Sequence, residues 1–161
     1  MSFMFLNFKL EDTIKGFLKP HVQDNISLYG FGEMCGKDEE LAEPWIGIRC
    51  ESSTSGPADV QLNYPVANRL YTAEIMIRTH AEDIIDTDGK TVIRTARDYH
   101  GDLCGQILDL FFVDSIIDDL NVSAVGQIFV NQIDQPTIDT TTEDRSFVTK
   151  IVFPILCNPM E

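Results

Sequence analysis

Apolar side chains recur along this sequence at two spacings, one helical and one alternating. The helical spacing predicts two helices. The first predicted helix spans Phe3–Lys19 and ends at Pro20, because proline is excluded from a helix interior. Its apolar residues recur at broadly helical spacing: Phe5, Phe8, Ile14, Phe17 and Leu18. A longer helix is predicted within Thr91–Leu120. A single apolar stripe marks it: Ala96, Tyr99, Leu103, Ile107, Leu110 and Phe111.

The second spacing alternates from one residue to the next and predicts four strands: Trp45–Cys50, Arg69–His80, Val125–Ile133 and Ser146–Leu156. Alternation in the second strand predicts one buried and one exposed face. The fourth strand is apolar on both faces, which is typical of a strand at the centre of a sheet or covered on both sides. Pro154 argues instead for an edge or a bulge.

Polar and glycine-rich segments separate these elements. Residues His21–Glu43 contain three glycines and an acidic run, so they are predicted to form a loop with one short helical turn at most. Asp86–Gly89 is predicted to be a plain turn. It does not fit a calcium loop, because aligning the glycine puts Ile84 and Thr95 at the first and last ligand positions. Asp134–Arg145 is a polar connection of 12 residues between the last two strands, and its length is typical of a functional loop.

The order of elements predicts the fold class. Helix, two strands, long helix and two strands favour an α+β two-layer domain, in which the long helix covers a mainly antiparallel four-stranded sheet and the N-terminal helix is added. A chain of 161 residues without internal repeats is predicted to form one domain over residues 1–161.

Charge restricts the partners of the protein. The chain has 12 Lys and Arg against 26 Asp and Glu, a net charge of −14, and the acidic excess is larger after residue 80. Such a chain is not expected to bind nucleic acid through a broad cationic surface or to bind an anionic membrane. By charge alone, a solvated acidic face that keeps the chain soluble is favoured over an acidic wall facing a negatively charged partner.

The cysteines and the hydropathy exclude further classes. Cys35, Cys50, Cys104 and Cys157 lie in four different segments without a C-x-x-C motif, so free thiols are expected and zinc or redox motifs are not. The apolar runs are far shorter than the ~18 residues that span a bilayer, and the N-terminus lacks the pattern of a signal peptide.

Catalytic motifs are also lacking. The sequence has no G-x-S-x-G, phosphate loop or dinucleotide fingerprint, so no catalytic, metal-binding or cofactor-binding residue is assigned, no cofactor is expected, and an enzyme is the less favoured reading. His100 is predicted to pack between helix and sheet. His80 ends a strand beside Glu82 and Asp83, where a solvated strand end is favoured over a metal or acid–base role. Trp45 fits a core or sheet-edge aromatic and an interface anchor equally well.

Several segments together resemble one family. They are Pro44–Glu51 (PWIGIRCE), Glu74–Asp83 (EIMIRTHAED), His100–Leu103, Ile107–Phe111, Arg145–Phe153 (RSFVTKIVF) and Cys157–Pro159. With the N-terminal helix included, nearly the whole chain resembles the tail-terminator, or tail-completion, proteins of long-tailed bacteriophages. These segments are patterns of fold rather than a catalytic signature, and Val60–Arg69 departs from the pattern.

The resemblance implies a structural function in the virion. Such proteins form a ring, commonly a homo-hexamer, that docks on the last ring of tail-tube subunits, stops growth of the tube and presents a surface to the head connector. The chain would then lie in the tail or neck, after assembly in the host cytoplasm. Genome DNA would pass through the lumen without specific binding, and an acidic lumen would let it slide.

A ring of this kind needs two different patches on each subunit. We expect the polar loops Ser52–Tyr64, Glu82–Lys90 and Asp134–Arg145 to contact neighbouring subunits, the tube or the connector. The residues assigned to these interfaces are Trp45, Ser55, Asp59, Asp86, Asp88, Asp134, Asp139, Glu143 and Asp144. Arg78 and Arg97 are expected to form local surface ion pairs rather than pairs across an interface.

Two alternatives stay open. One is another neck or head-completion adaptor of similar size. The other, from a different class, is a small acidic enzyme or ligand-binding module.

Overall fold

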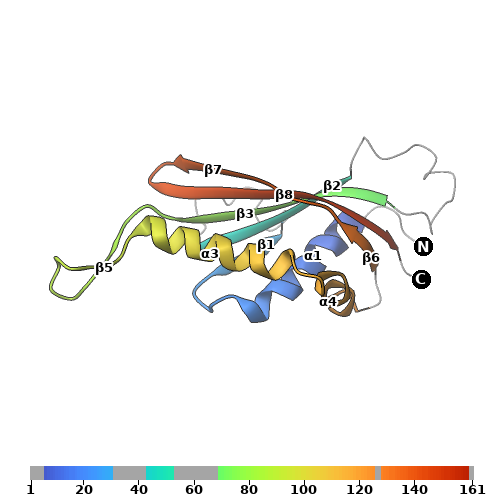
Figure 1. Ribbon diagram of the computed structural model, residues 1–161, viewed down its shortest axis with the longest axis horizontal. Coiled ribbons are helices and arrows are strands. Elements are labelled where there is room, and N and C mark those ends of the chain that lie inside the picture. The colour runs from blue at the N-terminus through green and yellow to red at the C-terminus, as the bar shows by residue number, and fades with distance from the viewer. Residues whose placement is uncertain (1–5, 31–42, 53–68, 126–127, 160–161) are drawn as a thin grey trace.

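The computed structural model describes residues 6–30, 43–52, 69–125 and 128–159 (Figure 1). These ranges contain three α-helices: α1 (Leu6–Leu18), α3 (Ala96–Phe111) and α4 (Ile116–Ser123), with a single 3₁₀ turn, η1 (Lys19–His21), after α1. The strands are β1 (Ser27–Gly30), β2 (Trp45–Ser52), β3 (Arg69–His80), β4 (Ile84–Ile85), β5 (Val92–Arg94), β6 (Ile128–Ile133), β7 (Thr137–Glu143) and β8 (Ser146–Pro159).

Six of the strands form one curled, mixed sheet in the order β1-β2-β3-β8-β6, and β7 also pairs with β8. β1 runs parallel to β2, and every other neighbour is antiparallel. The protein is therefore α+β, as the element order predicts. The predicted sheet of four antiparallel strands is wrong in detail, because it lacks β1 and β7.

The helices lie together on one face of the sheet (Figure 1). The alternation predicted for β3 is confirmed, since every second side chain of this strand is buried toward the helices: Tyr71, Ala73, Ile75 and Ile77. From the helical layer, α1 and α3 contribute the following buried side chains: Leu10, Ile14, Leu18, Leu103, Ile107 and Phe111. Burial of these apolar side chains is the main driving force for joining the two layers.

The helix predicted within Thr91–Leu120 is present as α3, which contains the whole predicted apolar stripe, but it is not the only element of the segment: β5 precedes it and α4 follows it. The break after Phe111 has a physical reason. The rings of Phe111 and Phe112 both contact Phe153, at centroid distances of 5.7 and 5.6 Å. Consecutive residues of a helix point about 100° apart, so packing of both rings on one partner favours a backbone that leaves the helix at Phe112.

Two segments predicted as connections contain strands. In His21–Glu43, residues Ser27–Gly30 form β1, and its pairing with Trp45–Ile48 is a contact that the local sequence pattern does not reveal. In Asp134–Arg145, Thr137–Glu143 form β7. β7 joins β8 through Asp144 and Arg145, both at positive φ (44° and 66°), as in a two-residue hairpin turn.

Pro154 lies where the edge partner of β8 changes. β7 pairs with Ser146–Val152 and β6 with Ile155–Pro159, so the two strands follow each other along one edge of β8. The Pro154 carbonyl accepts a hydrogen bond from the Asp134 N–H at 3.0 Å, between these two ladders. β8 is thus a central strand. Pro154 lies between the β7 and β6 ladders, at an irregular position of the kind to which proline is restricted within a sheet.

Candidate functional site

The hairpin of β4 and β5, here called the arm, extends beyond the end of the main sheet (Figure 1). Its apolar side chains, Ile84, Ile85, Val92 and Ile93, are between 44% and 63% exposed. Several large apolar side chains exposed on one small hairpin are candidates for contact with a partner. The arm is therefore the first candidate for a site of assembly.

A tight turn closes the arm, as predicted for Asp86–Gly89. The Gly89 N–H donates to the Asp86 carbonyl at 2.9 Å, and Gly89 has a φ of 74°. The Asp88 carboxylate accepts hydrogen bonds from the Lys90 and Thr91 N–H groups, both at 2.8 Å. The Thr91 hydroxyl and these two N–H groups hold the pKa of Asp88 below its usual range, so the carboxylate stays charged and keeps the turn closed.

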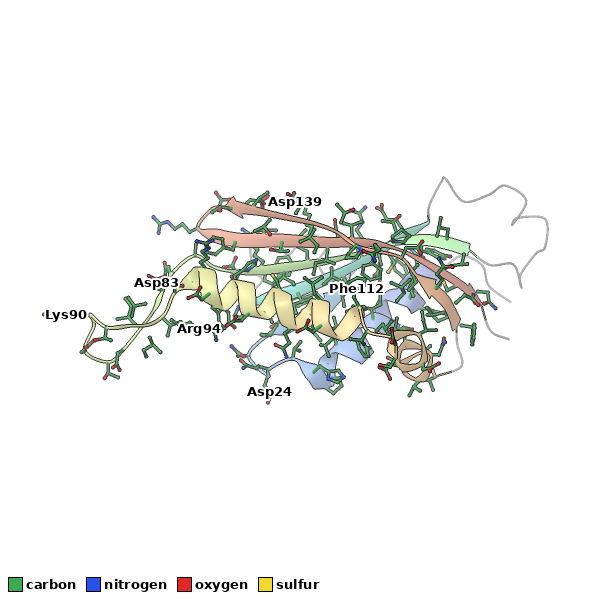
Figure 2. All side chains as sticks on the ribbon, in the orientation of Figure 1. Asp24, Asp83, Lys90, Arg94, Phe112 and Asp139 are labelled. Atoms are coloured by element: carbon green, nitrogen blue, oxygen red, sulfur yellow. The ribbon has the colours of Figure 1, made fainter. Side chains whose placement is uncertain are left out.

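The base of the arm is fastened to helix α3 (Figure 2). The Asp83 carboxylate accepts the Ala96 N–H at 2.8 Å, and the Thr95 hydroxyl caps the helix by accepting the Asp98 N–H at 3.2 Å. Arg94 forms an ion pair with Asp102, and its guanidinium carbon lies 5.5 Å from the centroid of the Tyr99 ring. These contacts fix the direction of the arm relative to α3.

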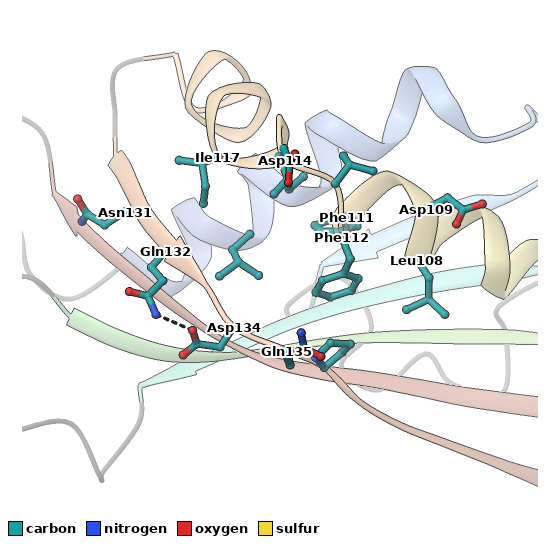
Figure 3. A pocket seen from close by; sticks show the side chains of 14 residues that line it. Leu108, Asp109, Phe111, Phe112, Asp114, Ile117, Asn131, Gln132, Asp134 and Gln135 are labelled. Atoms are coloured by element: carbon teal, nitrogen blue, oxygen red, sulfur yellow. Dashed lines mark hydrogen bonds between the residues drawn. The ribbon is translucent and has the colours of Figure 1, made fainter.

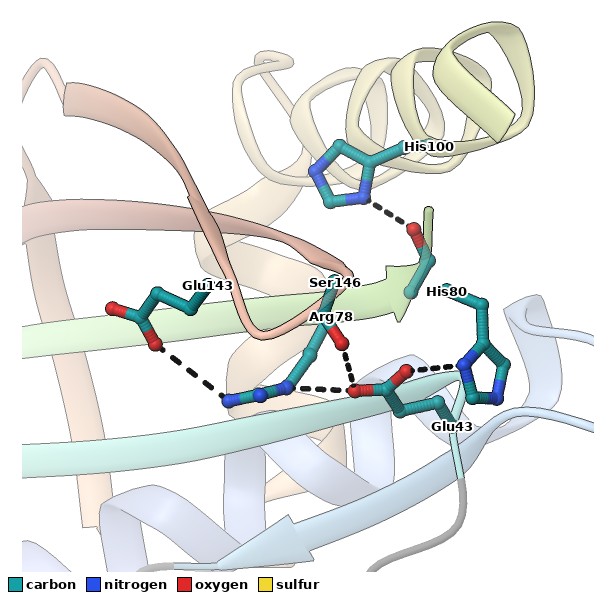
Figure 4. Close-up of polar contacts among 7 residues, drawn as sticks. Glu43, Arg78, His80, His100, Glu143 and Ser146 are labelled. Atoms are coloured by element: carbon teal, nitrogen blue, oxygen red, sulfur yellow. Dashed lines mark hydrogen bonds and ion pairs between the residues drawn. The ribbon is translucent and has the colours of Figure 1, made fainter. Parts of the chain in front are cut away.

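An ionic cluster joins the arm's end of the sheet to the β7–β8 turn (Figure 4). Glu43 Oε1 accepts hydrogen bonds from Arg78 Nε at 2.7 Å and Ser146 Oγ at 2.5 Å. Glu43 Oε2 lies 2.8 Å from His80 Nδ1, and Glu143 lies 3.7 Å from Arg78 Nη1. Glu43 is the centre of the cluster, with its side chain only 10% exposed. Because it precedes the first predicted strand, the sequence pattern did not single it out.

The two carboxylate oxygens of Glu43 differ in the contacts that they make. Those of Oε1 are hydrogen bonds, whereas the contact between Oε2 and Nδ1 lacks hydrogen-bond geometry among the described residues. This second contact is an ion pair only in the charged form of the imidazole. His80 is 63% exposed, as expected of a solvated strand end. Arg78 forms ion pairs with Glu43 and Glu143 of its own chain, and the expectation that it does not pair across an interface stays a prediction.

His100 lies buried between α3 and the sheet, as predicted. Its Nδ1 is 2.8 Å from the Thr79 hydroxyl and its Nε2 is 2.7 Å from the Thr149 hydroxyl, which lies 2.9 Å from that of Thr140. Burial lowers the pKa of His100. The imidazole is therefore neutral near pH 7, with each ring nitrogen facing one hydroxyl.

A cavity of about 420 Å³ opens beside His100 and Cys104. Burial raises the pKa of the Cys104 thiol, and this outweighs the opposing effect of the Thr149 side chain. A protonated thiol next to a neutral imidazole is not the thiolate that nucleophilic catalysis needs. The cavity therefore does not present a nucleophilic thiolate.

A larger groove, of about 720 Å³, lies at the far end of α3 from the arm (Figure 3). The turn between α3 and α4 forms one wall, and β6 with the residues that follow it forms the other. Its apolar lining includes Leu108, Phe112, Ile117 and Ile133. Its acidic lining is Asp109, Asp114 and Asp134. Of these residues the sequence analysis had singled out only Asp134, because the groove depends on how two distant segments pack.

The structure distributes the predicted interface residues over separate surfaces. Asp86 and Asp88 lie on the arm. Asp139, Glu143 and Asp144 lie on β7 and its turn, and every residue of β7 is exposed. Asp134 lies in the groove, at the opposite end of α3. Ser55 and Asp59 lie outside the described residues.

Trp45 does not have the exposure of an interface anchor. Its side chain is only 3% exposed, and its ring meets that of Tyr29 edge to face at a centroid distance of 6.4 Å. Of the two interpretations left open, the structure supports the core aromatic.

Comparison with known proteins adds no family. No protein-family model matches the chain, and no curated protein matches it. Among the described residues, no group of three or more His, Cys, Asp or Glu side chains is arranged to hold a metal ion. None of the helices in the described ranges is long and apolar enough to cross a membrane.

Proposed function

We propose that this chain is a non-enzymatic assembly protein of the tail-terminator type. Copies of it would form a ring at the end of a phage tail tube, end polymerisation of the tube and join the tail to the head connector. The resemblance that suggests this function maps onto β2, β3, α3 and β8. Those elements form the centre of the sheet and its cover, so the likeness involves the framework of the fold rather than one loop.

One observation carries the proposal furthest: the arm. Four apolar side chains stand in water on a hairpin whose direction is fixed by Asp83 and Arg94. In an isolated subunit this surface gains nothing from burial, whereas in an assembly a neighbour covers it. A preorganised arm also loses little conformational freedom on binding.

The acidic edge of the sheet suits the passage of DNA. β7 and its turn expose Asp139, Glu143 and Asp144 beside the threonines of the strand. In the proposed ring we assign this edge to the lumen, where carboxylates repel the phosphates of the genome and prevent it from adhering.

The test is to measure native mass and to image the protein by negative stain, with and without purified tail tubes. A multiple of 18.1 kDa, six copies in the commonest case, together with one extra disc at one end of each tube, would support the terminator. Tubes assembled in the presence of the protein should also stop at a defined length. A chain that leaves tubes uncapped but binds purified head connectors would favour the other neck or head-completion adaptors instead.

The cavity beside His100 supports a second candidate, a small ligand-binding module. Its volume of about 420 Å³ lies within the range of small-molecule pockets. A chain that is monomeric, ignores tubes and connectors, and is thermally stabilised by a compound from a small-molecule screen would favour this function.

A further inference from the structure

We infer that the groove between the α3–α4 turn and β6 binds a basic amphipathic helix of another protein. The inference deepens the proposed function and rests on it in one respect: in a neck assembly, such a helix would belong to a tube or connector subunit. The groove itself belongs to this chain, so its binding can be measured without tubes.

The floor of the groove is apolar and only partly covered. Four of its side chains pack against the core and keep part of their surface open: Leu108, Phe112, Ile117 and Ile133. Val113 also lines the groove and is 44% exposed. An apolar partner would remove this surface from water, which favours binding.

Carboxylates stand on both walls of the groove. Asp109 and Asp114 lie on the helical wall, and Asp134 lies on the strand wall (Figure 3). All three residues are exposed, and none of them forms an ion pair with a basic side chain of the described ranges. The surrounding sequence supplies no counter-ion either, since residues 98–144 include ten Asp or Glu and no Lys or Arg. The walls therefore favour a cationic partner.

The same charges disfavour a second copy of this chain as the partner. The net charge of each copy is −14, so copies repel one another at long range. The arm is apolar enough to enter a groove, but its tip has Asp86 and Asp88 against the single cation Lys90. Acidic walls and an acidic tip are not complementary. The partner is consequently a different protein, with Lys or Arg on the face that makes contact.

The backbone of β6 favours a docked helix over an added strand. β6 lies at the edge of the described sheet, but the Asn121 side chain of α4 occupies it at Val130. The Val130 N–H donates to Asn121 Oδ1 at 2.7 Å, and Asn121 Nδ2 donates to the Val130 carbonyl at 3.1 Å. A strand could pair there only by displacing this amide. An apolar floor between two acidic walls instead matches a helix whose apolar stripe is flanked by Lys or Arg on both sides.

The test uses a defined probe, a labelled helical peptide of about 14 residues built from leucine and lysine. Its leucines form one stripe and its lysines flank the stripe on both sides; we call it the Leu/Lys peptide. Fluorescence anisotropy of the full chain should give a Kd in the micromolar range. Two matched peptides, one with glutamate for lysine and one with serine for leucine, should bind at least tenfold more weakly, because each lacks half of the complementarity.

The acidic walls are tested by neutralising them. Asp109→Asn, Asp114→Asn and Asp134→Asn together should weaken binding of the Leu/Lys peptide about tenfold, since each removed carboxylate loses one exposed charge contact. The matched control makes the same change of net charge at exposed positions that do not line the groove, with Asp12→Asn, Asp24→Asn and Asp139→Asn. It should weaken binding no more than twofold. Circular dichroism confirms that both variants fold.

The apolar floor is tested separately. Val113→Ser should weaken binding of the Leu/Lys peptide at least threefold, because it removes methyl groups that the peptide would cover. Val122→Ser is the matched control, since Val122 is 79% exposed on α4 and does not line the groove. It should leave the Kd unchanged. NMR spectra of the full chain should show the largest changes at the backbone amides of residues 113–117 and 131–135.

Several results would overturn the inference. Equal weakening by the two Asn triple variants, or tight binding of the serine peptide, would reduce the effect to non-specific attraction by a chain of charge −14. NMR changes centred elsewhere would place the peptide on another surface. Displacement of the peptide by an equal concentration of octylammonium would make the groove a site for small organic cations. Self-association of the wild type that the peptide disrupts would make a second copy the occupant.

The proposed function fails separately. If the Leu/Lys peptide binds the groove but the protein ignores purified tubes and connectors, the inference stands without the terminator. If the protein caps tubes but the peptide does not bind the groove, the terminator stands without the inference.

Discussion

Glu11 illustrates how a single buried side chain completes the sheet. Its Oε2 accepts the Cys50 N–H at 2.9 Å, and the residue is only 3% exposed. β1 pairs with β2 only as far as Ile48, so the Cys50 N–H lies beyond that ladder. The carboxylate from α1 thus satisfies a backbone donor that would otherwise be buried without a partner.

Replacing Glu11 tests this role. Glu11→Ala should lower the free energy of unfolding by about 1–3 kcal/mol, because the Cys50 N–H is left buried and unsatisfied. Glu11→Gln keeps an acceptor oxygen and should cost less. Urea midpoints at constant m-value measure both. If both variants lose the same free energy of unfolding, Glu11 does not stabilise the fold through this hydrogen bond.

His100 should make stability depend on pH. Because burial lowers its pKa, the unfolded chain takes up a proton at a pH where the folded chain does not. The stability present above the usual histidine pKa of 6.5 is therefore lost as the pH falls from that value through the lowered pKa of the folded state. The comparison is with His100→Gln, which removes the titration of His100 and leaves every other titratable group in place. The wild type should lose more stability than this variant between pH 7.5 and 5.5 in urea melts, and parallel profiles would contradict the assignment.

At the scale of elements, the β7–β8 hairpin carries a local strain. Arg145 adopts a φ of 66°, a conformation that costs a residue with a side chain about 1–2 kcal/mol. Its carbonyl, which accepts the Ala81 N–H at 2.7 Å, is independent of the side chain.

Arg145→Gly should therefore stabilise the chain. Relief of strain exceeds the extra entropy that glycine gains in the unfolded state, so a gain of up to about 1 kcal/mol in the free energy of unfolding is expected. Arg97→Gly, at an exposed position in the first turn of α3, should instead destabilise the chain slightly, because glycine is a poor helix former. Thermal unfolding of the two variants is the measurement, and a shift of the same sign in both would argue against the strain.

Periodicity predicted the elements that it controls directly. β2, β3 and β8 lie where alternation places them, and α1 differs from its predicted bounds by a few residues. β1 escaped prediction because its pairing with β2 is parallel and its own four residues carry no alternation. β7 was hidden by its polarity, although its run of β-branched threonines is a strand signal that the hydrophobic pattern does not register. The α3–α4 break depends on where Phe153 lies, which is information about packing.

The candidate site, like the fold, was predictable from the sequence only in part. The sequence identified the polar segments that form the arm tip and the β7–β8 turn, because turn residues mark them. It did not identify the exposed isoleucines of the arm, since exposure is a property of the fold and not of the residue type. Nor did it identify the groove, whose walls come from α3, α4 and β6.

For the molecule as a whole, the net charge determines whether it binds DNA. The wild type should not retain duplex DNA even at low salt, because its charge is −14. Changing Asp139, Glu143 and Asp144 together to lysine should produce salt-dependent retention if this edge faces the lumen of an assembled ring. Gel shifts measure the effect.

A control variant carries the same charge change on the helical side, at Asp12, Asp24 and Asp118. It should bind DNA more weakly, since an assembled ring would keep those residues away from a threaded strand. Equal retention by both variants would show that the β7 edge has no special exposure to DNA.

The position of β8 in the sheet has a consequence for how the chain is made. β8 is the last described strand, yet it lies at the centre, and in the described sheet β6 and β7 pair with no other strand. While the ribosome still holds Ser146–Pro159, β3 lacks one partner and the arm end of the sheet cannot close through the contact of Ala81 with Arg145. The nascent chain therefore completes its fold late. A product truncated before Ser146 would lack the strand that joins β3 to β6 and β7 in the described sheet.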